Sequence, residues 1–146
     1  MTFRLMTMED YPACYSLWLN TPGMGLNSLD DSAEGIARYL QRNPNTCFVA
    51  EEEGQLLGAI LAGHDGRRGH ISHTAVAAHA QRRGIGTQLV EHAMAALERE
   101  GITKVNLVAF SRNEKGNRFW EAMGFTARTN LVYRDKRICE SERIDT

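Results

Sequence analysis

The chain has 146 residues, of which 42% are hydrophobic and 24% charged, and its formal net charge is −1. This length is enough for one domain with a hydrophobic core and argues against two. The charge argues against a general nucleic-acid or anionic-membrane binder, since such proteins are normally basic. No apolar run is long enough to cross a bilayer, and residues 1–15 lack the apolar core of a signal peptide. The widely separated Cys14, Cys47 and Cys139 form no CxxC pair, which favours a reduced, cytoplasmic location.

The first half of the chain predicts a short strand, two helices and a three-stranded meander. Residues 2–6 suit the strand, and Thr7 can cap the first helix. One proline and two glycines interrupt regular structure in residues 20–31. Asp31 or Ser32 can cap the second helix. The second helix and the meander cover residues 33–43 and 46–76.

A turn with two glycines and an amphipathic helix open the second half, where residues 80–101 read AQRRGIGTQLVEHAMAALEREG. Apolar residues recur at every fourth position of this helix, which predicts one buried face. The sequence then predicts a strand at 104–110, a short helix at 113–123 and a last strand at 131–138. A meander followed by alternating strands and helices indicates a single α+β domain over residues 1–146, with helices packed on a mixed sheet.

The glycine turn before the long helix has the features of an anion site. The N–H groups in the first turn of a helix lack partners within the helix, and the helix dipole is positive at that end. Gly84 and Gly86 have no side chains to block the approach of a phosphate, and Arg82 and Arg83 add positive charge. The alternative is a tight strand-to-helix turn with solvated arginines.

Two common nucleotide fingerprints do not fit this turn. A Walker A loop requires a lysine after its last glycine, and none follows Gly84 or Gly86. A dinucleotide-binding turn requires a third glycine where Leu89 stands, and an acidic residue at the end of the next strand, which is absent. A P-loop NTPase and a dinucleotide-binding enzyme are therefore both disfavoured.

The segment QRRGIG instead resembles the Q/R-x-x-G-x-G/A motif of the GNAT superfamily of acyl-CoA-dependent N-acetyltransferases. A second segment, NEKGNRFWEAMGF, resembles the N-x-x-A-x-x-F-Y-E-x-x-G-F segment of that family, and the residues in register are Asn113, Phe119, Glu121, Gly124 and Phe125. The resemblance covers essentially the whole chain. It implies a strongly twisted mixed sheet whose fourth and fifth strands, residues 69–76 and 104–110, splay apart.

The resemblance also implies acetyl-CoA as co-substrate and no metal. The glycine turn would hold the pyrophosphate, and the pantetheine arm would lie in the gap between the splayed strands. The residues that would contact the co-substrate are Ala75, Val76, Gln81, Arg82, Arg83, Gly84, Ile85, Gly86, Thr87, Asn113 and Trp120. The backbone N–H near Val76 would bind the oxyanion that forms during transfer.

Transfer to an amine requires a general base, and the segment RGHISHTAV supplies His70 and His73. Residues three apart on a regular strand face opposite sides, so we do not expect the two histidines to act as a pair. His70 ranks slightly ahead, because in related enzymes the base on this strand matches its position. A bulge in the strand would favour His73. The alternative is a histidine without a catalytic role, with a chain of water molecules carrying the proton.

The general acid is where the sequence departs from the family. Trp120 stands where the usual tyrosine would be, and an indole N–H does not protonate a thiolate. Either Tyr133 supplies the proton, or CoA leaves as the thiolate. We interpret Trp120 as an apolar wall for the co-substrate arm.

The acceptor site in this family lies between the first two helices, which here are joined by residues 19–32. Met24 and Leu26 offer apolar contacts, and Asp30 and Asp31 would attract a cationic amine, although a helix cap is the simpler interpretation of Asp31.

Three hypotheses about function remain. The first is acetyl transfer to a small-molecule primary amine by direct attack in a ternary complex. The second is transfer to a protein N-terminus or lysine. The third is a non-catalytic CoA-binding regulatory module, which the loss of the tyrosine at Trp120 keeps open. We expect no nucleic-acid or membrane partner, and a homodimer is compatible with each hypothesis.

Overall fold

A mixed sheet forms the centre of the computed structural model, which describes residues 1–145. Within that range the structure has five strands in the order β1-β2-β3-β4-β5, antiparallel from β1 to β4 and parallel between β4 and β5. The strands are β1 (Thr2–Leu5), β2 (Phe48–Glu52), β3 (Gln55–His64), β4 (Gly69–Val76) and β5 (Val105–Asn106). The predicted single α+β domain with a mixed sheet is confirmed.

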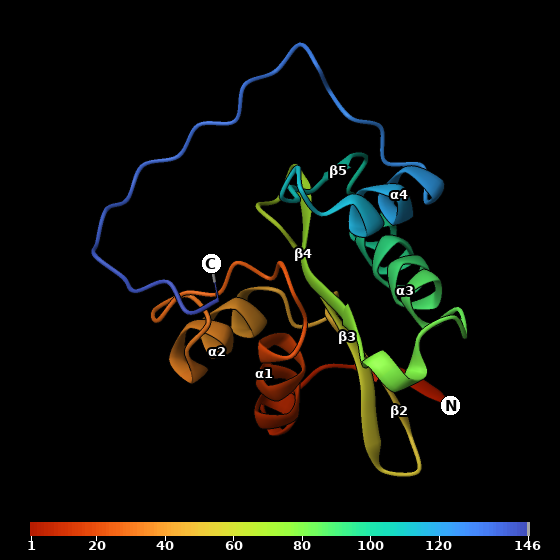
Figure 1. The fold of residues 1–146 in the computed structure, drawn as a ribbon. Helices are drawn as coiled ribbons and strands as arrows, with labels where there is room; N and C mark the ends of the chain where they lie inside the picture. Colours follow the sequence, from red (N-terminus) through yellow and green to blue (C-terminus); the bar gives the residue numbers. More distant parts are fainter. Residues whose placement is uncertain (146) are drawn as a thin grey trace.

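Helices cover both faces of the sheet, with α1 and α2 on one side and α3 and α4 on the other (Figure 1). Their bounds are α1 (Tyr11–Leu19), α2 (Ala33–Arg42), α3 (Ile85–Arg99) and α4 (Glu114–Ala122), with short 3-10 turns η1 (Met8–Asp10) and η2 (Ala78–Ala80). No helix within the described range is both long and apolar enough to cross a membrane.

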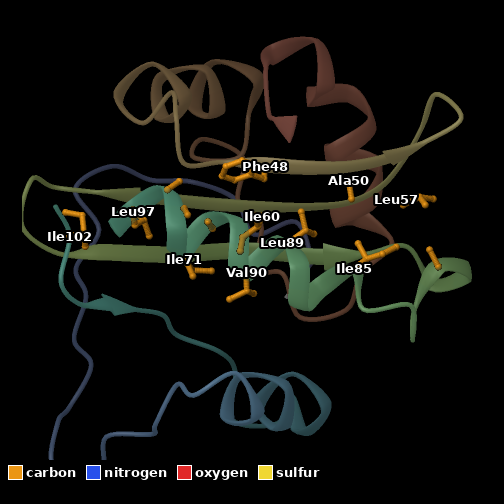
Figure 2. Close-up of a cluster of buried hydrophobic side chains, with 14 residues drawn as sticks. Phe48, Ala50, Leu57, Ile60, Ile71, Ile85, Leu89, Val90, Leu97 and Ile102 are labelled. Atoms are coloured by element: carbon orange, nitrogen blue, oxygen red, sulfur yellow. The ribbon is translucent and has the colours of Figure 1, made fainter. Parts of the chain in front are cut away.

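Two apolar clusters hold these layers together. On the α3 side, Leu89, Val90 and Leu97 of the helix lie against Ile60 and other residues of the sheet (Figure 2). The periodicity of the sequence predicted this buried face. On the opposite side, residues of α1 and α2 pack against another set of strand residues. The sheet therefore separates two apolar cores, one on the side of α3 and the other on the side of α1 and α2.

The strands β4 and β5 part soon after they meet. They pair at only two positions, Gly69 with Val105 and His70 with Asn106. The chain after β5 leaves the ladder, so β4 beyond His70 has no strand on that side. The splay that the family resemblance implied is confirmed.

A bulge interrupts β4 in front of this gap. The register with β3 changes between Ala59, which pairs with Ala75, and Leu61, which pairs with Ser72. Two residues of β4 therefore stand opposite one residue of β3, and the backbone of His73 adopts a left-handed φ of 45°. Side chains after the bulge therefore point to the face of the sheet opposite to the one that a regular strand would give them.

The predicted last strand at 131–138 is wrong. Residues 127–141 form an extended, exposed arm outside the sheet, and the chain hydrogen-bonds to the body again at residue 142 (Figure 1). Leu131 and Val132 are 60% and 74% exposed. A strand requires a partner for its backbone groups, and β5 is too short to extend a ladder to this arm. The arm ends where Ser28 N–H donates to the carbonyl of Glu142 at 2.8 Å.

Candidate active site

A cavity of about 1590 Å³ runs along β4, from the α1–α2 connection to the first turns of α3 and α4. Small-molecule sites commonly occupy roughly 300–1,000 Å³, so this cavity has room for two substrates. Its lining includes residues from both helical layers and from the free stretch of β4. The gap between β4 and β5 thus connects the two sides of the sheet.

The first turn of α3 lies at one end of the cavity. Gly84 precedes the helix with a φ of 77°, and no side chain caps the helix there. The first helical hydrogen bond runs from Gln88 N–H to the Gly84 carbonyl. Within residues 1–145, the N–H groups of Gly86 and Thr87 therefore have no acceptor. Arg82 also has a left-handed φ of 66°, which is uncommon for a residue other than glycine and marks a turn held in a special shape.

The two arginines of this turn differ in their surroundings. Arg82 lines the cavity, whereas Arg83 donates to a carboxylate oxygen of Glu52 on β2 at 2.8 Å. That hydrogen bond raises the pKa of Arg83 and lowers the pKa of Glu52. Lys115 of α4 also lines the cavity and adds a second positive charge to that of Arg82, and it was not predicted from the sequence.

Gln81 joins this turn to β4 and α4. Its Nε2 donates to the carbonyl of Val76 at 3.3 Å, and its Oε1 accepts a hydrogen bond from Lys115 Nζ at 2.7 Å. Ala77 N–H donates to the carbonyl of Leu57 on β3 at 2.8 Å. Because backbone groups alternate in an antiparallel ladder, Val76 turns its N–H away from β3 and toward the gap. The predicted oxyanion donor therefore faces the cavity that it would serve.

Aromatic residues of α4 form the wall opposite the glycine turn. A Cβ placed on Gly86 would lie 3.4 Å from the ring of Phe119, so the helices meet closely at this point. Trp120 lines the cavity and packs edge-on against Phe119 and Phe125, with centroid distances of 5.0 and 5.3 Å. Asn113 also lines the cavity, and its Oδ1 accepts a hydrogen bond from Gly116 N–H at 3.0 Å, which caps α4.

Both histidines of β4 line the cavity, which corrects the prediction that they face opposite sides. Ile71 belongs to the core cluster on the α3 side, whereas Ala75 belongs to the cluster on the α1 and α2 side. Residues four apart, such as these two, share one face of a regular strand. The bulge between them has therefore reversed the side of the sheet to which the later side chains point. His73 consequently packs edge-on against Trp18 of α1, with a centroid distance of 5.0 Å.

The two histidines have different partners. His73 Nε2 lies 2.5 Å from Oδ1 of Asp31. The side chain of His73 is 14% exposed and that of Asp31 is 5% exposed, so this pair is largely shielded from water. Nδ1 of His73 has no hydrogen-bond partner among residues 1–145. His70 is exposed, and its Nδ1 lies 2.6 Å from Oδ1 of Asn106.

Asp31 is held in place by its own contacts. Its second carboxylate oxygen accepts a hydrogen bond from Asn27 N–H at 2.8 Å, and its carbonyl accepts one from the Tyr11 hydroxyl at 2.6 Å. The expectation that Asp31 caps α2 is wrong, because Ser32 does so by accepting a hydrogen bond from Gly35 N–H at 3.0 Å. Asp31 is thus free to orient the imidazole of His73.

The other predicted residues differ in whether they line the cavity. Tyr133 borders the cavity from the extended arm and is 71% exposed. Leu26 is 1% exposed and belongs to the core, whereas Met24 lines the cavity. The Oγ1 of Thr74, beside His73, is a buried hydroxyl with no hydrogen-bond partner in the described part of the chain. No group of three potential metal ligands occurs within residues 1–145.

Comparison with known proteins identifies relatives of this chain. The model of the acetyltransferase (GNAT) family matches residues 7–125. Acetyltransferase SG1711 of Sodalis glossinidius is 26% identical over 142 residues, which cover 97% of this chain and 99% of the relative.

Two solved structures have a similar fold. Ard1 from Thermoplasma volcanium shares 19% identity, with a TM-score of 0.76 over 88% of this chain and 84% of that one. The protein yncA from Salmonella typhimurium, solved with its cofactor acetyl-CoA, shares 22% identity, with a TM-score of 0.69 over 86% of this chain and 79% of its own. At this level of identity, the likeness establishes a shared fold.

Proposed function

Because the chain belongs to the acetyltransferase (GNAT) family, we propose that it transfers an acetyl group from acetyl-CoA to a primary amine of a small molecule, by direct attack in a ternary complex. The observation that carries this proposal is the single cavity that joins the uncapped start of α3 to the His73–Asp31 pair. An anion site and a proton acceptor are the two features that the reaction requires.

The N–H groups of Gly86 and Thr87 bind the pyrophosphate of acetyl-CoA, with Arg82 and Lys115 beside them. The geometry suits this ligand because the turn is open, has two glycines and presents its positive end to the cavity. The pantetheine arm lies along the free edge of β4, where Trp120 covers it. Aromatic side chains bury a large apolar area in such contacts.

His73 is the general base, and Asp31 orients it. A neutral imidazole that donates its Nε2 proton to Asp31 leaves the lone pair of Nδ1 free to accept a proton from the acceptor amine. The shielded carboxylate then stabilises the imidazolium that forms, as in other histidine–carboxylate pairs. His70 lacks this support, because its partner Asn106 carries no charge.

Two negative charges develop during the reaction, one on the thioester carbonyl oxygen and one on the sulfur of the leaving CoA. Val76 N–H donates to the oxyanion that develops on the thioester carbonyl as the amine attacks. CoA leaves as a thiolate, since a thiol has a pKa of about 8.5 and needs little help from an acid. Tyr133, the residue that the sequence suggested as an alternative proton donor, lies at the rim of the cavity. We place the reaction in the cytoplasm, where the free thiols of Cys14, Cys47 and Cys139 remain reduced.

The test is thiol release from acetyl-CoA in the presence of a panel of small amines and peptides, with His73→Ala and His70→Ala assayed beside the wild type. We expect acetylation of small amines, a rate for His73→Ala that is lower by roughly 10²–10⁴-fold, and a smaller effect for His70→Ala. Acetylation of peptides alone would assign a protein acceptor. Binding of acetyl-CoA without transfer to any acceptor would support a non-catalytic module and overturn the proposal.

A further inference from the structure

We propose that the acceptor carries an anionic group, a carboxylate or a phosphate, in addition to its amine, and that Arg38 and Arg42 of α2 bind that group. This inference rests on the proposed function, because it names the chemical class of the acceptor. It concerns α2 itself, for which the sequence alone predicted no binding residue.

The spacing of the two arginines brings them to one side of α2. Residues four apart on a helix are neighbours on its surface, and both Arg38 and Arg42 line the cavity together with Gly35 and Tyr39. Both side chains are exposed to water. Neither has a carboxylate partner within residues 1–145, although Arg4 and Arg83 are paired with acidic residues elsewhere on the surface. Among the described residues, the cavity therefore contains two guanidinium groups that form no ion pair, although Asp30 and Asp135 also line it.

Co-substrate phosphates are not the anions that this pair would bind. The proposed phosphate site is at the start of α3, whereas α2 covers the other face of the sheet (Figure 1). Arg82 and Lys115 already supply positive charge at the phosphate end of the cavity. Any anion at Arg38 and Arg42 must accordingly belong to the second substrate.

The charges along this half of the cavity match a molecule with two ends of opposite sign. Asp30 and Asp31 lie just before α2 and line the cavity, and Asp31 contacts His73, so the two carboxylates would attract an ammonium group toward the base. Arg38 and Arg42 follow one and two turns farther along the helix. At a rise of about 1.5 Å per residue, the positive charges begin roughly 8 Å from the start of α2. An amine with an anionic group several bonds away would satisfy both ends at once.

Arginine is suited to this role by its geometry. Its planar guanidinium donates two parallel hydrogen bonds to a carboxylate or a phosphate. Two such groups at neighbouring helix positions hold one anion from two directions. A neutral amine would leave both arginines solvated and gain nothing from them.

The experiment compares matched acceptors in the acetyl-CoA thiol-release assay. Straight-chain amines that end in a carboxylate, a phosphate, a carboxamide or a hydroxyl are used at equal chain lengths. The enzymes are the wild type, Arg38→Gln, Arg42→Gln and the double variant. Arg99→Gln serves as the control, since Arg99 is an exposed arginine at the end of α3 that does not line the cavity. Calorimetry measures the affinity of each variant for acetyl-CoA, which tests whether the co-substrate site is unchanged.

We expect the wild type to have a lower KM for the anionic acceptors than for the neutral ones. Each single variant should raise KM for the anionic acceptors roughly fivefold, and the double variant roughly 25-fold if the two effects add, as partly exposed charged contacts allow. KM for neutral amines, kcat and the affinity for acetyl-CoA should not change, and Arg99→Gln should match the wild type. The carboxylate and phosphate arms identify which anion is bound.

Two results would overturn the inference. Equal KM values for anionic and neutral amines in the wild type would show that the arginines are merely solvated, while transfer itself would leave the proposed function standing. Equal changes of KM for both acceptor classes in the variants would indicate a structural effect of the substitutions. Failure to acetylate any amine would overturn the proposed function and this inference with it.

Discussion

Replacing Asp31 with asparagine keeps the shape of the side chain beside His73 and removes its negative charge. In the native protein the carboxylate has one oxygen for Asn27 N–H, at 2.8 Å, and one for His73 Nε2, at 2.5 Å. An asparagine that keeps the first contact must turn its amide nitrogen toward His73. That nitrogen is a donor, so His73 would have to accept at Nε2 and carry its proton on Nδ1. Nδ1 is the atom that the proposed reaction needs as a base.

The magnitude follows from the loss of that base. General base catalysis typically contributes about 10²–10⁴-fold to a rate, which corresponds to about 2.7–5.4 kcal/mol of activation free energy at 1.36 kcal/mol per tenfold. Asp31→Asn should therefore lower kcat by at least roughly 100-fold, an effect similar in size to that of His73→Ala. The double variant should be little worse than either single variant, since both remove the same function.

Thiol release measured from about pH 6 to 9 is the appropriate assay, because a general base makes the rate rise with pH as it loses its proton. We expect Asp31→Asn to lose that rise while its affinity for acetyl-CoA, measured by calorimetry, stays within about twofold of the wild type. Glu34→Gln is the matched control, since Glu34 is an exposed acid in the first turn of α2 that does not line the cavity. A kcat for Asp31→Asn within about threefold of the wild type, with co-substrate binding intact, would refute the assignment of His73 and Asp31.

Two further predictions concern the co-substrate site and the stability of the fold. Gly86→Glu should abolish acetyl-CoA binding in calorimetry, because its side chain would meet Phe119 and put a negative charge where the phosphates bind; undiminished affinity would exclude the turn as the phosphate site. Burial raises the pKa of Asp10, but the Arg4 guanidinium and the Thr7 N–H together outweigh this effect and lower it, and hydrogen bonds from Arg4 also lower the pKa of Glu51. Carboxylates with lowered pKa stabilise the fold above their unfolded pKa and lose that effect as the pH falls through their folded pKa. Arg4→Gln should thus lower the melting temperature at pH 7, and the difference from wild type should shrink below about pH 4; a difference that is constant with pH would contradict this account.

The glycine turn and α3 were predictable from the sequence because their causes are local. The left-handed φ at Gly84 favours glycine in any context, and the periodic apolar residues of α3 determine which side is buried. The splay between β4 and β5 was also expected, although only through the resemblance to a family. These features place the predicted phosphate site, and each depends on residues close together in the chain.

The end of the cavity that holds His73 and Asp31 was predicted less well, because it depends on pairing between distant segments. The alternation of side chains on a strand predicts the face of His73 only if the strand is regular, and the bulge results from the register with β3. Its partner Asp31 lies 42 residues away, and the same aspartate fits the pattern of a helix cap equally well. A local pattern does not distinguish these roles.

The arm that replaces the predicted last strand illustrates a different limit. Leu131, Val132 and Tyr133 have the composition of a strand, and they are exposed because no neighbouring strand extends to them. Strand propensity describes how well a residue fits a sheet that already exists. The sequence of the arm contains no information about whether β5 is long enough to receive it.

The contact between residues 26–28 and residues 142–145 has a consequence for the order of folding. Leu26 N–H donates to the carboxylate of Asp145 at 2.6 Å, and Ile144 N–H donates to the carbonyl of Leu26 at 3.0 Å. These bonds join positions 119 and 118 residues apart, and closing so long a loop is entropically costly before other parts of the structure have formed. The segment that they anchor leads directly to Asp31. The sheet and α3 can therefore collapse first, whereas the segment that brings Asp31 to His73 is fixed later, when residues 142–145 reach residues 26–28.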